Sequence, residues 1–66
     1  MKLTEREKEV LHYICEGYTC PEIAKKLVVT HHTAEAHCAS ILDKLNAKTR
    51  AQAVYIALAN DLINFD

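Results

Sequence analysis

The stretch Leu27-Val28-Val29-Thr30-His31 decides the fold, because it leaves only three residues between the end of one predicted helix and the start of the next. Thr30 is a favourable N-cap for the second of these helices. A connection this short predicts two helices that cross steeply, as in a helix-turn-helix. The longer second helix then projects from the core, which is the geometry that enters the major groove of DNA. An ordinary helical hairpin inside a small bundle is the alternative at this point.

Threonines also mark the other helix starts. Each of three threonines is followed three residues later by Glu or Gln, which is the pattern of a capping box. With Thr30, these caps predict helices at about residues 5–16, 20–27, 31–45 and 50–59. Gly17 lies where a helix end requires a positive φ. The sequence therefore predicts an all-α, four-helix domain with a central helix-turn-helix. The three pairs are Thr4 and Glu7, Thr19 and Glu22, and Thr49 and Gln52.

Apolar residues recur at i, i+3 and i+4 within each predicted helix, as expected for a buried stripe. On the last helix the predicted core stripe leaves a second apolar face, and we expect that face to form a symmetric dimer interface. The predicted core residues are Val10, Leu11, Ile14 and Cys15; Ile23, Ala24 and Leu27; Ala34, Cys38, Ile41, Leu42 and Leu45; and Ala51, Val54, Tyr55 and Leu58. The predicted dimer interface is Ala53, Ile56, Ala57 and Asn60.

Length and composition exclude several classes of protein. A chain of 66 residues forms one small domain with a thin core, so we expect no enzyme, small-molecule substrate or cofactor. There is no apolar run of about 20 residues and no signal peptide, so we predict a cytoplasmic protein that does not enter the membrane. The three cysteines fit no common zinc pattern, and we expect free thiols and no metal. The net charge of −1 argues against binding nucleic acid by charge alone.

Four motifs are spread over nearly the whole chain, from Leu3 to about Ile63. They are Leu3-Thr4-Glu5-Arg6-Glu7-Lys8-Glu9-Val10-Leu11; Glu16-Gly17-Tyr18-Thr19 with Glu22-Ile23-Ala24-Lys25-Lys26-Leu27; Thr33 and His37 with Ile41, Lys44 and Leu45; and Arg50-Ala51-Gln52-Ala53-Val54. They resemble LTxREXEVL, EGxSNKEIAxxL, TVKxHxxxIxxKL and RxQAV of LuxR/FixJ-type (NarL-like) DNA-binding domains. The combined pattern is far more specific than any one motif.

The resemblance implies a four-helix domain that binds specific sequences of double-stranded DNA in transcription control, often as a dimer through its last helix. Most members of this family are the C-terminal part of a longer regulator. We therefore expect either an excised piece of a larger regulator or a free-standing short regulator.

The helix predicted at 31–45 carries the candidate DNA-binding face. A 100° wheel turns His32, Ser40 and Asp43 outward, and the resemblance places Glu35, Ala36 and Ala39 at the positions that usually touch bases. Threonine hydroxyls at its start suit phosphates. Five basic residues flank the expected groove side, namely Lys25, Lys26, Lys44, Lys48 and Arg50, of which we expect Lys25 and Lys26 to be solvated. The candidate DNA-binding residues are Thr30, His32, Thr33, Glu35, Ala36, Ala39, Ser40, Lys44, Lys48 and Arg50.

This face differs from the usual family pattern. The family commonly places Lys or Arg here, whereas this chain places none before Lys44 and carries Glu35 and Asp43 instead. A carboxylate is repelled by phosphates but can accept from cytosine N4. The leading hypothesis is thus a DNA-binding regulator. The alternative is a protein-interaction module that dimerises with or antagonises another regulator and has lost strong DNA binding.

Overall fold

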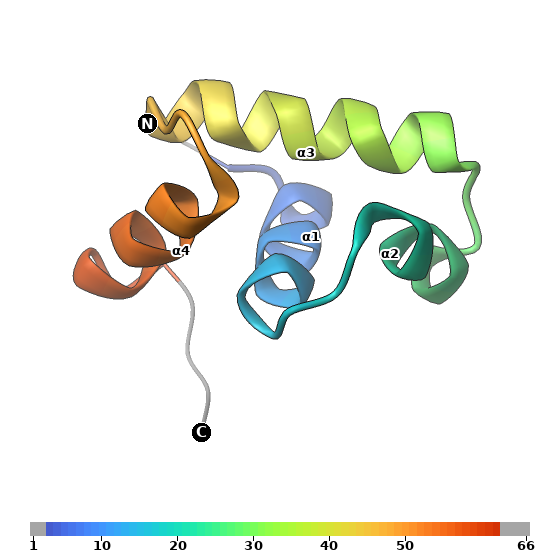
Figure 1. The fold of residues 1–66 in the computed structure, drawn as a ribbon, viewed down its shortest axis with the longest axis horizontal. Coiled ribbons are helices and arrows are strands. Elements are labelled where there is room, and N and C mark those ends of the chain that lie inside the picture. Colours follow the sequence, from blue (N-terminus) through green and yellow to red (C-terminus); the bar gives the residue numbers. More distant parts are fainter. Residues whose placement is uncertain (1–2, 63–66) are drawn as a thin grey trace.

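The computed structural model describes residues 3–62 and contains four α-helices and no strand within that range. The helices are α1 (Glu5–Cys15), α2 (Cys20–Leu27), α3 (His31–Leu45) and α4 (Arg50–Ala59). The predicted all-α class is confirmed, and only the end of α1 differs, by one residue. Figure 1 shows α3 running along one side of the molecule, with the other three helices packed beneath it.

Three of the four predicted capping arrangements form as expected. Glu7 donates its N–H to Thr4 and accepts from the Thr4 N–H, and Glu22 does the same with Thr19. The third predicted capping box is wrong in one half. The Thr49 hydroxyl accepts from the Gln52 N–H at 3.0 Å, but the Gln52 side-chain oxygen Oε1 accepts from the Lys48 N–H at 2.7 Å, one residue before the cap.

Residues with positive φ end the first three helices. Gly17 has a φ of 96°, as predicted, while Val28 and Asn46 each have a φ of 56°. A left-handed conformation is unusual for a β-branched residue such as Val. It closes α2, because the Val29 N–H then donates to the Ala24 carbonyl at 3.0 Å. The chain reverses at Val28 and enters α3 at once.

The predicted core is correct for the first three helices. α3 contacts each of the other helices, and its buried stripe meets those of α1 and α2. Cys15, Leu27 and Leu42 lie at the edge of the core and are only partly buried. The buried apolar residues of these helices are Val10, Leu11, Ile14, Ile23, Ala24, Ala34, Cys38, Ile41 and Leu45.

The predicted core face of α4 is mostly wrong, because only Val54 of its four residues is partly buried. Ala53 and Ala57, expected in a dimer interface, have no exposed surface, while Tyr55 and Leu58 are 71% and 50% exposed. Because both sides of α4 are apolar, periodicity could not choose between them. The alanines face the core because their small side chains let the α4 backbone approach α1 and α3 closely.

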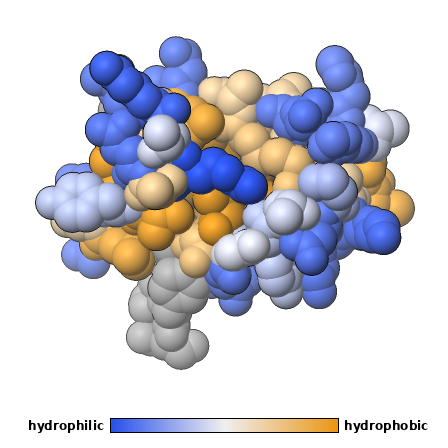
Figure 2. All heavy atoms as spheres, viewed as in Figure 1, coloured by the Kyte–Doolittle hydropathy of each residue, from blue (hydrophilic) through white to orange (hydrophobic). Residues whose placement is uncertain are grey.

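Of the other two residues of the predicted dimer interface, Ile56 is partly buried against the core, whereas Asn60 is exposed. The Asn60 side-chain amide donates to the Ile56 carbonyl at 2.8 Å. Figure 2 shows hydrophobic surface over the α4 region at the lower left of the molecule. Within residues 3–62, no helix is long and apolar enough to cross a membrane.

Candidate nucleic-acid interface

The outer face of α3 is free of packing contacts along its first half. His32, Glu35, Ala36 and Ala39 are all exposed, as the helical wheel predicts. In Figure 1, α3 lies across the picture while α2 is foreshortened beneath one of its ends, so the two helices cross and do not run side by side. The short junction therefore leaves this face of α3 open to a partner.

The first half of this face carries one carboxylate. His31 Nε2 lies 3.6 Å from Glu35 Oε2, and both side chains are more than half exposed. The Glu35 carboxylate therefore gives this part of α3 a negative charge, which a phosphate repels.

Thr30 and Thr33 organise the start of α3. The Thr30 hydroxyl accepts from the Thr33 N–H at 3.1 Å and donates to the Thr33 hydroxyl at 3.0 Å. The N–H groups of His31 and His32 belong to the first turn, where a helix has no acceptors of its own for them. This end of α3 therefore presents backbone donors and hydroxyls together, an arrangement that suits a phosphate oxygen.

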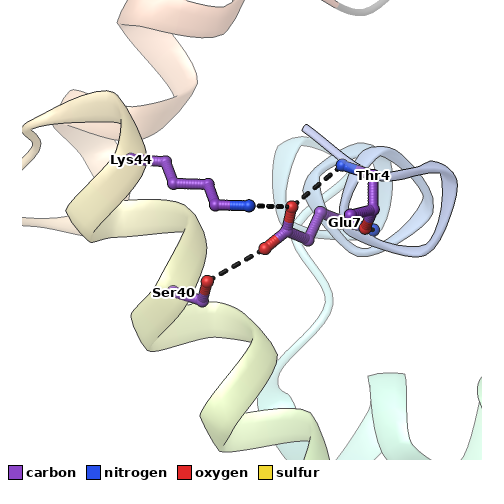
Figure 3. Close-up of polar contacts among 4 residues, drawn as sticks. All are labelled: Thr4, Glu7, Ser40 and Lys44. Atoms are coloured by element: carbon purple, nitrogen blue, oxygen red, sulfur yellow. Dashed lines mark hydrogen bonds and ion pairs between the residues drawn. The ribbon is translucent and has the colours of Figure 1, made fainter. Parts of the chain in front are cut away.

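Ser40 and Lys44 do not belong to the outer face, which corrects the sequence prediction. Figure 3 shows both side chains pointing from α3 toward Glu7 of α1. The Ser40 hydroxyl donates to Glu7 Oε2 at 2.9 Å, and Lys44 Nζ lies 2.7 Å from Glu7 Oε1. Lys44, the only Lys or Arg of α3, is thus held in a contact between helices.

Glu7 is the important residue that the sequence analysis did not assign to the core. Its side chain is only 7% exposed and also accepts from the Thr4 N–H. The hydrogen bond from Lys44 is the largest cause, with those from Thr4 and Ser40, that lowers the pKa of Glu7 to about 2. Its position three residues before Val10 and four before Leu11 was the available signal, because it extends their buried stripe.

Arg50 and Lys48 remain on the surface near the α3–α4 connection. The Arg50 guanidinium donates through Nη2 to the Tyr18 carbonyl at 3.0 Å, which ties the start of α4 to the loop before α2. Lys48 is exposed. The sequence analysis also missed a contact in this loop: Lys26 Nζ lies 5.2 Å from the centre of the Tyr18 ring, which is stacked on Tyr13.

A three-residue junction, a crossing helix pair and an open α3 face define a helix-turn-helix domain. Residues 1–57 match the family of bacterial regulatory proteins named the luxR family. The chain belongs to this family and is a LuxR-type helix-turn-helix DNA-binding domain.

Relatives in sequence are transcription regulators. The chain is 44% identical over 63 residues to the oxygen regulatory protein NreC of Staphylococcus carnosus, covering 96% of this chain and 29% of that protein. It is 44% identical over 62 residues to the transcriptional regulatory protein LiaR of Bacillus subtilis, covering 94% and 29%. The chain thus spans 29% of the length of these relatives.

Solved structures share the fold. The response regulator ChrA of a heme-sensing two-component system matches with a TM-score of 0.90 and 30% identity, over 96% of this chain and 31% of that chain. VqmA of Vibrio cholera, solved as a complex with ligand and DNA, matches with a TM-score of 0.86 and 31% identity, over 94% and 27%.

Proposed function

We propose that this domain places α3 in the major groove of a promoter and regulates transcription in the bacterial cytoplasm. The observation that carries the proposal is the open outer face of α3 on a domain of the luxR family. The similarity to VqmA, whose structure was solved with DNA, supports the same placement. The relatives are longer proteins, and a larger regulator is the expected context of the domain.

Base contacts come from Glu35, Ala36 and Ala39 in this proposal, with His32 at the groove edge. The Glu35 carboxylate accepts from cytosine N4, and the alanine methyl groups touch thymine methyl groups. All four side chains are exposed. The preferred site is therefore expected to contain a cytosine beside one or more thymines.

Phosphate contacts come from the start of α3 and from the α3–α4 connection. Thr30, Thr33 and the neighbouring N–H groups hold one phosphate, while Lys48 and Arg50 hold others. Lys44 is not included, because its ammonium group is paired with Glu7. With so few cations the salt dependence is expected to be shallow, since log K changes by about −0.9 per phosphate neutralised with log salt concentration.

A dimer through the outer face of α4 would bring two domains to neighbouring half-sites. Tyr55 and Leu58 expose large apolar side chains on this face, and Ala51 beside them is exposed too. A symmetric pair of such helices covers the same patch on both copies. The interface proposed here thus replaces the one expected from the sequence.

Selection from a random DNA pool, followed by fluorescence anisotropy at low salt, tests the function. We expect one enriched motif and tighter binding to it than to a scrambled duplex. Absence of any enriched motif, with no binding at tens of micromolar protein, would refute the proposed DNA reading.

A charge reversal tests the place of Glu35. Glu35→Lys is expected to raise affinity for nonspecific DNA and weaken the preference for cytosine at one position. Glu9→Lys is the matched control, because Glu9 follows Glu7 by two residues and therefore points away from α3. Equal gains in the two variants would mean that Glu35 is not near the DNA.

The dimer has its own test in sedimentation velocity. Leu58→Glu is expected to leave a folded monomer, whereas Gln52→Glu keeps the oxygen that accepts from the Lys48 N–H and should keep the dimer. A wild-type chain that sediments as a monomer at high concentration and on DNA removes the dimer from the proposal.

The protein-interaction alternative also has a specific observation in its favour. The ammonium group of Lys44 on α3 is paired with Glu7, while Glu35 and Asp43 are exposed on the same helix. Such a surface suits a partner protein with basic groups. Binding of a purified full-length regulator, together with a flat DNA selection, would favour this alternative.

A further inference from the structure

Two cysteine sulfurs meet where α2 packs on α3. Cys20 is the first residue of α2, and Cys38 lies on the buried side of α3. The Cys20 thiol donates to Cys38 Sγ with the two sulfurs 3.5 Å apart. Two residues 18 positions apart in the chain are thereby in van der Waals contact through the atoms that a disulfide would join.

The two thiols differ in access. Cys20 is only partly buried, whereas Cys38 is 7% exposed and belongs to the core. Burial, with the neighbouring Cys20, raises the pKa of Cys38 to about 11, although the charge of Arg50 acts in the opposite direction. At neutral pH Cys38 is therefore a protonated thiol behind a more accessible partner.

We infer that Cys20 and Cys38 are a reversible oxidation site at which a peroxide forms a disulfide between the two helices of the helix-turn-helix. Cys20 sulfur attacks the peroxide, becomes a sulfenic acid and releases one water when the peroxide is hydrogen peroxide. Cys38 sulfur then attacks the Cys20 sulfur, the S–S bond forms, and the hydroxyl leaves as a second water with the Cys38 proton. Two thiols are oxidised by two electrons, and one peroxide is reduced.

The bond would act on the element that faces DNA. It joins α2 to α3 and closes a covalent loop that contains the Val28 junction. The loop lowers the conformational entropy of the unfolded chain and so stabilises the folded domain. The third cysteine, Cys15, is half-buried on α1 and is not part of this contact. This inference does not depend on the DNA sequence that α3 reads.

Mass spectrometry of the full chain tests the bond directly. After hydrogen peroxide and alkylation, the wild type should contain one disulfide, with the loss of two hydrogen atoms, and one alkylated cysteine, and dithiothreitol should then release two thiols. A glutamate-specific protease cuts after Glu16 and Glu35, which places Cys15, Cys20 and Cys38 on separate peptides. The linked pair should contain Cys20 and Cys38.

Cys15→Ser is the matched control and should form the same bond, whereas Cys20→Ser, at a partly exposed position, should not. A linkage through Cys15, a disulfide between two chains, or addition of oxygen to Cys20 without a bond would overturn the inference.

Thermal unfolding supplies a second measurement. The oxidised wild type and Cys15→Ser should unfold at a Tm roughly 10 °C above their reduced forms. Peroxide should not raise the Tm of Cys20→Ser. A rise of the same size in Cys20→Ser would show that the stabilisation comes from another site and would also overturn the inference.

Discussion

The helices α3 and α4 are both held by the same small core, but they use opposite kinds of side chain to reach it. α3 buries large residues such as Ile41 and Leu45, and its outer face is mostly polar. α4 buries Ala53 and Ala57 and leaves Tyr55 in solvent. The stability of α3 therefore depends on the volume it fills, and that of α4 on how closely its backbone approaches its neighbours.

The largest effect should come from removing a large side chain on α3. Ile41→Ala should lower the free energy of unfolding by about 2–5 kcal/mol, because Ile41 is fully buried and leaves a cavity. In the monomer, Tyr55→Ala on α4 should change it by less than about 0.5 kcal/mol, because that ring is 71% exposed in the single chain. Urea denaturation of both variants measures the difference. Equal losses would mean that Tyr55, too, fills the core.

A smaller effect should come from enlarging an alanine on α4. Ala57→Leu should cost about 1–3 kcal/mol, since Ala57 has no exposed surface and the added carbons must displace α4. Ala51→Leu makes the same change on the exposed side and should cost less than about 0.5 kcal/mol. Tm values by circular dichroism compare the two. If Ala57→Leu leaves the Tm unchanged and Ala51→Leu lowers it, α4 presents Ala51, and not Ala57, to the core.

The contrast between these helices also explains what could be predicted. Caps and junction lengths determine helix boundaries locally, so the four ranges and the helix-turn-helix followed from threonines, glutamates and one glycine. A face can be assigned only where polar and apolar residues alternate, as they do around Ala34 and Glu35. Around Val54 and Tyr55 no such contrast exists, and the choice depends on tertiary packing.

The partners of Glu7 could not be predicted from the sequence, for a different reason. Ser40 and Lys44 are polar residues on a helix whose outer face was expected to be polar, so a wheel turns them outward. They are turned toward α1, which presents a buried carboxylate at that point, and Lys44 remains exposed. A pair 33 to 37 residues apart in the chain leaves no periodic signal. The candidate DNA-binding set loses two members as a result.

The two helices should also differ in how pH affects their packing, because α3 contacts the ionisable side chain of Glu7 and α4 buries only alanines. The pKa of Glu7 is lowered to about 2, so ionised Glu7 stabilises the fold above its usual pKa, and that contribution is lost as the pH falls toward 2. Glu7→Gln should lower the free energy of unfolding at pH 7. Between about pH 5 and pH 2 the free energy of unfolding of this variant should fall less steeply, by a slope that corresponds to at most about one proton taken up on unfolding.

Urea titrations at several pH values measure this decline, and Glu9→Gln, an exposed carboxylate on the same helix, is the control. If the two variants show the same pH dependence, Lys44 and Ser40 do not depend on Glu7, and Lys44 returns to the candidate DNA-binding set.

The smallest effect should come from the helix starts. Thr30 caps α3 and Thr49 caps α4, each by accepting one N–H, so Thr30→Ala and Thr49→Ala should each cost about 1 kcal/mol of stability. Only Thr30 lies at the end of the helix that faces DNA in the proposed function. Thr30→Ala should therefore also weaken binding to every sequence by a similar factor, while Thr49→Ala should leave affinity unchanged when both variants are folded. Anisotropy below the Tm of each variant separates the two outcomes, and an equal loss of affinity would mean that Thr30 has no particular role in holding a phosphate.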